Sequence, residues 1–288
     1  MGIKKVVKKL LPKELKEALK KEIGSNTSYV LNISDVKKLE NKIAVVTRGS
    51  GAIGSALCFR LAMEGATVGV GARSLNKAEI VINNIKKNGG NAFPVLMDLI
   101  DDKSIDVAFE KIYAEYGPMD ILVNNAGGSA RNAAKNFEEQ DFSVIDTVLN
   151  INLRGTMYCT YAALKHMKRE NTSRIINMSS IVGLQGKRGM TDYAASKAGL
   201  LGFTRSLALE LGKTGITVNS VSPGWVSRAV FDKGMEVQQG NVNCMGHSGK
   251  TDDVAGAVAF LVSEEANYIT GQNIIIDGGR SLGLWGDN

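Results

Sequence analysis

The sequence is poor in the residues that hold metal ions and disulfides. Its 288 residues include only two histidines and three cysteines. No two cysteines have CxxC spacing, so neither a disulfide framework nor a zinc site is expected. Two histidines are also too few to favour a histidine-based metal site or a Ser-His-Asp triad. We interpret His166 and His247 as surface or structural residues, and Cys58 and Cys159 as small core residues within helices.

Long apolar runs are missing as well, and the positive charge is confined to one end. No run approaches the roughly 20 residues that span a bilayer. The lysine-rich start lacks the apolar core of a secretory signal, so we expect a cytoplasmic protein. Residues 1–24 contain eight lysines and three glutamates, a net +5 of the chain's +6. The remainder is nearly neutral, which argues against nucleic acid as a partner.

The charged start predicts a basic amphipathic helix. Its apolar residues recur at helical spacing, with lysines on the other face: Ile3, Val7, Leu11, Leu15, Leu19 and Ile23. We assign residues 1–40 to a helical arm and linker, and residues 41–288 to one domain. The arm is expected either to lie peripherally on anionic membrane lipid or to pack on a neighbouring subunit, and the second is the simpler interpretation.

From residue 41 onward, short β-rich runs alternate with helix-length segments. This alternation predicts an α/β fold with a three-layer, doubly wound, seven-stranded parallel sheet. The expected strands are Lys42–Thr47, Thr67–Ala72, Ala92–Met97, Ile121–Asn124, Arg174–Met178, Thr217–Val221 and Asn273–Ile276. The expected helices are Ala52–Glu64, Asn76–Asn88, Ser104–Tyr116, Asp141–Lys168, Tyr193–Leu211 and Asp252–Ser263.

The first turn between a strand and a helix has a glycine pattern suited to phosphate. Gly49, Gly51 and Gly54 follow the strand in GxGxxG spacing. Glycines there allow the backbone to approach a pyrophosphate, which binds at the positive N-terminus of the helix. A purely structural turn is the alternative, because an isolated match is weak evidence.

The end of the second expected strand indicates which dinucleotide binds. A chain that binds NAD is expected to place Asp or Glu there, to hold the adenosine 2′-hydroxyl. Here Ala72 leaves space, and Arg73 supplies a cation suited to a 2′-phosphate. The pattern favours NADP(H) over NAD(H), with a solvated surface arginine as the alternative.

Tyr193 and Lys197 give the strongest chemical signal. They lie four residues apart at the start of an expected helix, so both side chains project from one face. A tyrosine with an ordinary pKa near 10 is a poor base at neutral pH, and a neighbouring cation favours its phenolate. The spacing alone also occurs on ordinary helices.

Several further motifs surround this pair. Asn124-Asn125-Ala126-Gly127 follows the fourth strand, and Ser180 lies thirteen positions before Tyr193. Pro223-Gly224, Ile269-Thr-Gly-Gln272 and Asp277-Gly278-Gly279 follow in order. Together these motifs resemble the short-chain dehydrogenase/reductase family, in particular its 3-oxoacyl-carrier-protein-reductase-like members. The resemblance covers roughly residues 41–280 and implies a Rossmann fold.

The resemblance implies a role for each matching residue. Tyr193 would exchange a proton with the substrate oxygen, and Lys197 would lower the Tyr193 pKa and bind the nicotinamide ribose. Ser180 would hydrogen-bond the carbonyl, and Asn152 would support a water relay to the lysine. The implied cofactor residues also include Arg48, Gly49, Ser50, Gly51, Ile53, Gly54, Arg73, Asp98, Leu99, Asn124, Ala126, Gly127, Pro223, Gly224 and Val226.

Two positions depart from the family pattern. Arg48 stands where the family usually has glycine, and its side chain either crowds the adenosine ribose or reaches a 2′-phosphate. Crowding is the outcome we favour. Arg228 stands where threonine is common, which puts a pyrophosphate contact there in question.

The sequence thus predicts an NADP(H)-dependent oxidoreductase that converts a ketone to a secondary alcohol and back. A homodimer or homotetramer is implied by the resemblance. The alternative is an inactive nucleotide-binding scaffold of the same fold, which Arg48 keeps open. The identity of the small-molecule substrate is not readable, because residues 229–245 replace the usual short substrate lid without a recognisable pattern.

Overall fold

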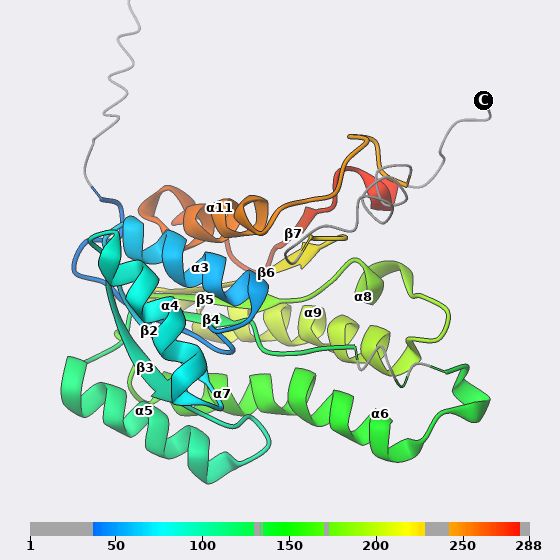
Figure 1. Cartoon of the computed structure of the whole chain (residues 1–288), viewed down its shortest axis with the longest axis horizontal. Helices are drawn as coiled ribbons and strands as arrows, with labels where there is room; N and C mark the ends of the chain where they lie inside the picture. Colours follow the sequence, from blue (N-terminus) through cyan, green and yellow to red (C-terminus); the bar gives the residue numbers. More distant parts are fainter. Residues whose placement is uncertain (1–36, 130–132, 134, 170–172, 228–241, 283–288) are drawn as a thin grey trace, which may run out of the picture. The chain divides into compact units, whose positions relative to one another are not determined.

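A parallel sheet with helices on both faces forms the described part of the chain (Figure 1). The structure is a computed structural model that describes residues 37–129, 133, 135–169, 173–227 and 242–282. The predicted basic helix of residues 1–24 lies outside the described residues. No helix in these described ranges is long and apolar enough to cross a membrane.

All seven strands of the sheet are parallel, in the order β3-β2-β1-β4-β5-β6-β7. The strands are β1 (Ile43–Val46), β2 (Thr67–Ala72), β3 (Asn91–Leu96), β4 (Ile121–Asn124), β5 (Ser173–Met178), β6 (Ile216–Pro223) and β7 (Asn273–Ile276). The predicted fold class is confirmed, and the expected strand bounds differ from these by two residues at most.

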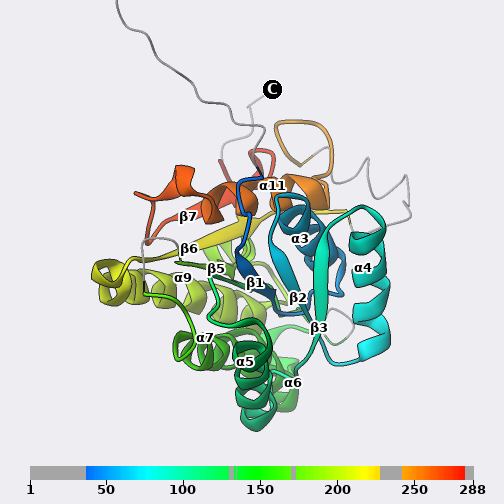
Figure 2. The ribbon, with the colours of Figure 1, turned by 90° about the vertical axis from the view of Figure 1, so that its left-hand side faces the viewer.

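Three long helices pack on each face of the sheet. One face carries α3 (Ala52–Met63), α4 (Leu75–Lys87) and α11 (Thr251–Val262), and the other α5 (Asp102–Tyr116), α7 (Gly155–Leu164) and α9 (Thr191–Leu211). Figure 2 shows α3 and α11 above the sheet and α5 and α7 below it. The short elements are η2 (Phe137–Glu139), α6 (Phe142–Leu149), η3 (Asn150–Arg154), α8 (Val182–Gln185), η4 (Gly212–Thr214), η5 (Glu264–Ala266) and η6 (Arg280–Leu282).

Alternation along β1 shows why the layers form. Ala44 and Val46 pack with the helices α3, α4 and α11, whereas Val45 faces α5, α7 and α9. All three side chains are fully buried. Successive strand residues point to opposite faces, so an uninterrupted apolar run needs a helical layer on each side.

The single helix expected over Asp141–Lys168 is instead divided. The Asp141 carboxylate accepts a hydrogen bond from Ser143 N and starts α6, but a π-helical turn, η3, separates α6 from α7. The last regular turn ends at Leu164, because the chain after it runs beside residue 119, where Met119 N donates to the His166 carbonyl. Asn152, one of the predicted site residues, lies inside this π turn.

The strand order places a crevice between β1 and β4. The chain goes from β1 outward to β3 and then returns to β4 on the other side of β1. The loops after these two neighbouring strands therefore leave in opposite directions, and ligands of open α/β sheets bind in the gap between them.

Candidate active site

Thr47 joins the two loops that border the crevice. Its side chain is buried, and its Oγ1 accepts hydrogen bonds of 3.0 Å from both Asn125 N and Ala126 N. In return, Asn125 Nδ2 donates to the carbonyls of Thr47 and Arg48, each at 3.2 Å. The loop after β1 and the loop after β4 are thereby held as one unit.

Two of the three motif glycines are required by close packing. A Cβ on Gly54 would lie 2.2 Å from the Arg48 carbonyl, and one on Gly49 would lie 2.8 Å from Cys58 Sγ. A Cβ on Gly51 would lie 3.4 Å from the Arg48 carbonyl, so the constraint there is weaker. Gly51 is the N-cap of α3 and has no side chain to cap it, which leaves the helix N-terminus open to an anion.

A cavity of about 710 Å³ lies beside this turn, where the sequence analysis expects the adenosine of the cofactor. Arg73 and Lys77 bring positive charge to its wall, while Asp98 and Leu99 follow β3. Its other predicted members are Arg48, Ser50, Gly51, Ala126, Gly127 and Asn152. The sequence analysis did not single out Lys77, although its position four residues after Arg73, in the first turn of α4, was the available signal.

Arg48 occupies the side of this cavity nearest the crevice. Its backbone has φ = 51°, in the left-handed region that favours glycine. Its guanidinium Nη1 donates a hydrogen bond to the Gly127 carbonyl in the opposite loop. The side chain thus spans from one loop to the other.

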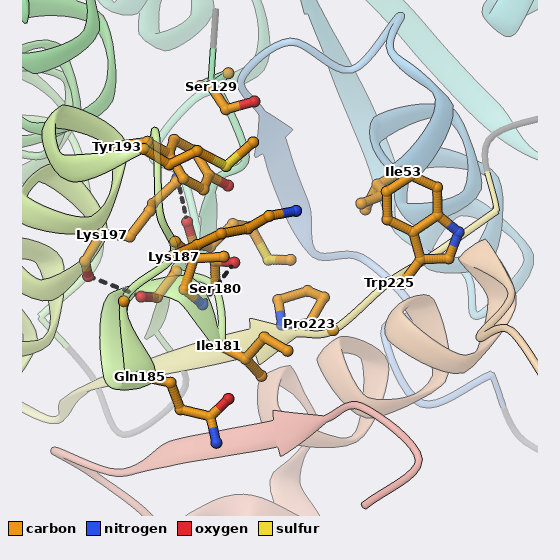
Figure 3. Close-up of a pocket in the computed structure, with 18 of the residues that line it drawn as sticks. Ile53, Ser129, Ser180, Ile181, Gln185, Lys187, Tyr193, Lys197, Pro223 and Trp225 are labelled. Carbon is orange, nitrogen blue, oxygen red and sulfur yellow. Dashed lines mark hydrogen bonds between the residues drawn. The ribbon is translucent and has the colours of Figure 1, made fainter. Parts of the chain in front are cut away.

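A second cavity, of about 280 Å³, contains the predicted catalytic side chains. Ser180, Tyr193 and Lys197 line it, and Figure 3 shows them on neighbouring segments around one space. It is also lined by four residues predicted to bind the cofactor, Ile53, Gly127, Pro223 and Gly224. The sequence analysis assigned no role to two further lining residues, Asn125, which lies inside the quoted motif of residues 124–127, and Trp225, which directly follows Pro223-Gly224.

Lys197 is buried, and the backbone at the end of β5 accepts a hydrogen bond from its ammonium. Its Nζ donates a 2.6 Å hydrogen bond to the Met178 carbonyl at the end of β5, and lies 5.9 Å from the centre of the Tyr193 ring. Burial first, and the nearby Arg48 cation second, lower the pKa of Lys197 from 10.5 to about 8. The side chain can therefore hold or release a proton close to neutral pH.

Asn152 links the π turn to the loop after β4 and to helix α9. Its Nδ2 donates to the Gly128 carbonyl and to Ser196 Oγ, both at 3.0 Å, and its Oδ1 accepts from Gly128 N at 3.0 Å. A Cβ on Gly127 would lie 2.9 Å from Asn152 Oδ1 and 3.0 Å from Lys197 Nζ. Glycine at position 127 therefore lets the backbone approach both polar groups.

The serine pair after β5 has two separate tasks. Ser179 Oγ donates to the Lys197 carbonyl at 2.8 Å and so fixes α9 against the strand. Ser180 Oγ accepts from Val182 N at 3.2 Å, which leaves its hydroxyl proton available toward the cavity. Both serines line the cavity, so the choice of Ser180 over Ser179 as the residue facing substrate stays a prediction.

Asn124, which the sequence analysis expected among the cofactor residues, is buried and lines neither cavity. Its side chain is 1% exposed, and its Nδ2 donates to Thr160 Oγ1 and Asn177 Oδ1, both at 2.9 Å. As the last residue of β4 it points into the sheet-helix layer, and the next residue, Asn125, faces the cavity instead. Of the described residues, neither Gly49, Gly54 nor Val226 lines either cavity, and Arg228 lies outside the described residues.

The histidines and cysteines take no part in the described site. Cys58 and Cys159 are buried, and burial raises the pKa of both thiols. His166 packs against the Tyr113 ring at 5.0 Å, and His247 is exposed. Within the described ranges, no three His, Cys, Asp or Glu side chains cluster as metal ligands.

Comparisons with known proteins agree with this geometry. The model of the family described as enoyl-(acyl carrier protein) reductase matches residues 46–281. A 3-oxoacyl-acyl-carrier-protein reductase of Staphylococcus aureus is 38% identical over 246 residues, covering 84% of this chain and 98% of its own. A corresponding reductase of Thermotoga maritima is 36% identical, with coverage of 84% and 98%.

Solved structures give the same result. A short-chain dehydrogenase of Burkholderia cenocepacia in complex with NADP has a TM-score of 0.78 and 36% identity, covering 84% of this chain and 99% of its own. A short-chain dehydrogenase/reductase of Serratia marcescens has a TM-score of 0.78 and 34% identity, with coverage of 85% and 99%. The chain belongs to the short-chain dehydrogenase/reductase family.

Proposed function

We propose that this chain catalyses reversible hydride transfer between NADP(H) and a ketone or secondary alcohol. The observation that carries the proposal is the convergence of Ser180, Tyr193 and Lys197 on one cavity, next to a second, nucleotide-sized cavity. Gly127 lines both cavities. A dinucleotide can therefore extend from one to the other, with its reactive end beside Tyr193.

The residues present fit NADP(H). The cradle at Gly54 admits no Cβ, the N-terminus of α3 is uncapped by a side chain, and Arg73 and Lys77 offer cations for a 2′-phosphate. Ala72 occupies the position where a carboxylate would repel that phosphate. NADPH, when bound, supplies the hydride to the carbonyl carbon.

Proton transfer falls to Tyr193. In the reductive direction its hydroxyl donates a proton to the carbonyl oxygen, while Ser180 Oγ donates a hydrogen bond to the same oxygen. The Lys197 ammonium, buried behind the Tyr193 ring, favours the phenolate that remains. Asn152 is a positioning residue, since it holds the Gly128 backbone and Ser196 in α9.

An inactive scaffold is the less economical alternative. All four residues of the proposed proton-transfer set are retained, three of them around an open cavity. A chain that only bound nucleotide would gain nothing from burying Lys197, which costs desolvation free energy.

The test is NADPH oxidation by a panel of ketones, followed with Tyr193→Phe and the parent chain. We expect turnover in the parent, and a loss of at least about a hundredfold in kcat in the variant, because general acid-base catalysis contributes that much. NADPH affinity, titrated by fluorescence, is expected to stay nearly unchanged. A variant that kept most of its kcat would refute the role of Tyr193.

We further propose a homodimer or homotetramer built on α7 and α9. An apolar groove of about 570 Å³ runs along these helices, and its wall includes Leu153, Met157, Tyr161, Leu164, Phe203 and Leu207. Tyr161 is 60% exposed in the isolated chain, and contiguous exposed apolar surface favours association. Light scattering that reported a monomer at micromolar concentration would refute the assembly.

The helix predicted for residues 1–24 gives a separate proposal. We propose that it packs on a neighbouring subunit, with binding to anionic lipid as the competing outcome. Deleting residues 1–24 and comparing oligomeric state and vesicle co-sedimentation at two salt concentrations separates the two. If the full-length chain ignores anionic vesicles at low salt, the lipid alternative fails.

A further inference from the structure

Among its described lining residues, the catalytic cavity has cations but no carboxylate. The three cations are Lys187, Lys197 and Arg280. Lys197 belongs to the proton-transfer set. Lys187 has no part in that chemistry, yet it brings positive charge to the space where the substrate carbonyl must lie.

The chain presents Lys187 to the cavity by a defined turn. Lys187 lies between α8 and α9, six residues before Tyr193, and its carbonyl accepts a 3.0 Å hydrogen bond from Met190 N. The flanking Gly186 and Gly189 have φ = 74° and 72°, so both sides of the turn use the left-handed region. Figure 3 shows the Lys187 side chain extending into the cavity, on the same side as Tyr193 and Ser180.

The next residue provides a contrast. Arg188 Nε donates to Asn136 Oδ1 at 3.3 Å, and Arg188 is not one of the described lining residues. Two adjacent cations on an exposed turn therefore point to different places. The inward direction of Lys187 is a property of that position, and not of a generally basic surface.

We propose that the cavity selects ketones that carry a carboxylate or phosphate group, and that the Lys187 ammonium binds this anion. The proposal rests on the function proposed above and specifies its substrate class. A cation beside the reacting carbonyl would bind the anion of the correct substrate and orient the carbonyl toward Ser180 and Tyr193. A neutral ketone of the same shape would lack this contact.

The experiment compares matched pairs of ketones with the full chain and NADPH. One arm uses 3-, 4- and 5-oxo acids against their methyl esters, and the other uses dihydroxyacetone phosphate against dihydroxyacetone. We expect kcat/KM to be at least about fivefold higher for the anion in one arm, a size suited to a charged contact that is partly exposed. The arm that responds identifies the anion, and the best chain length reports its distance from the carbonyl.

Variants at positions 187 and 188 test whether the anion preference comes from Lys187. Lys187→Gln is expected to reduce the anion preference to about unity by raising the KM of the anion, while Lys187→Arg retains most of it. Arg188→Gln, the matched control, is expected to leave the preference unchanged. Added salt should raise the KM of the anion in the parent and not that of its neutral partner.

The outcomes distinguish failure of the proposed oxidoreductase function from failure of the proposed anion preference. If no ketone in either arm, charged or neutral, causes NADPH oxidation, the proposed function fails and this inference fails with it. If neutral and charged partners react equally, or the neutral partner is preferred, the inference is overturned while the function stands. If Lys187→Gln weakens NADPH binding and lowers kcat/KM for both partners alike, Lys187 is a cofactor ligand and the inference is overturned.

Discussion

The Arg48 guanidinium donates a hydrogen bond to the Gly127 carbonyl and so connects the loop after β1 to the loop after β4. These loops border the crevice, and both residues line the adenosine-side cavity. A Cβ on Gly128 would lie 3.6 Å from Arg48 Nη1, so the guanidinium lies close to the second loop along two residues. A dinucleotide entering the crevice has to displace this side chain or pass beneath it.

Arg48→Gly is expected to raise NADPH affinity. Glycine adopts φ = 51° without the cost of order 1 kcal/mol that a side chain adds there, and it removes the guanidinium from the crevice. Fluorescence titration should show tighter binding by a few-fold, accompanied by higher kcat/KM. The Arg48→Lys variant keeps both a cation and a side chain at this position, and should show little of the gain. Weaker binding by the glycine variant would instead make Arg48 a cofactor ligand.

The Arg48 case also shows what the sequence could and could not predict. The alternating segments predicted the sheet from local periodicity. The resemblance of the ordered motifs to the family led to Ser180, Tyr193 and Lys197, which the structure brings to one cavity. The direction of a side chain in a loop depends on contacts from distant segments. For that reason neither the Arg48–Gly127 hydrogen bond nor the burial of Asn124 could be predicted, and Lys77 and Lys187 were missed.

Arg73→Ala is expected to weaken NADPH binding by roughly 1–3 kcal/mol while leaving NADH binding nearly unchanged, through loss of a charge-assisted contact to the 2′-phosphate. Lys77 lines the same cavity and is expected to carry part of the effect, so the double variant should lose more than either single variant. Calorimetric titration with both cofactors measures the difference. Equal losses for the two cofactors would show that Arg73 does not discriminate between them.

Thr47→Val tests the connection between the two loops. Valine has nearly the same shape but cannot accept the hydrogen bonds from Asn125 N and Ala126 N. Asn125 N keeps its 3.0 Å hydrogen bond to the Val123 carbonyl, whereas Ala126 N would be left unpaired in a buried place. We expect a loss of about 2 kcal/mol or more in the free energy of unfolding, measured in urea, and a higher KM for NADPH.

The matched control for this change is Thr156→Val. Thr156 is equally buried, but its hydroxyl only donates to the Asn152 carbonyl within a helix. Its removal leaves no backbone N–H without a partner, so the stability loss should be clearly smaller. Similar losses for the two variants would mean that the loop connection is not what Thr47 contributes.

Lys197 makes the stability of the fold depend on pH in a defined window. Burial, and then the Arg48 cation, lower its pKa in the folded chain to about 8, whereas the unfolded value is 10.5. Below about pH 8 the folded chain must hold the buried ammonium, which costs free energy. Between the two values the unfolded chain binds more protons, so the contribution of this group to the free energy of unfolding rises with pH.

Comparing the parent with Lys197→Met, both in a Tyr193→Phe background, isolates this contribution, because the tyrosine whose titration depends on Lys197 is then absent and the other groups titrate alike in both chains. Urea unfolding at pH 7, 8.5 and 10 should show the parent gaining stability relative to the variant as pH rises, by an amount on the order of 1–3 kcal/mol, since each pKa unit corresponds to about 1.4 kcal/mol. Removing the Arg48 cation should shift the pH range in which the parent gains stability. In an Arg48→Gly background the Lys197 pKa rises toward its ordinary value, so the gain in the free energy of unfolding begins at higher pH and is smaller. A difference between parent and Lys197→Met that stays constant from pH 7 to 10 would mean that Lys197 keeps its ordinary pKa and that neither burial nor Arg48 tunes it.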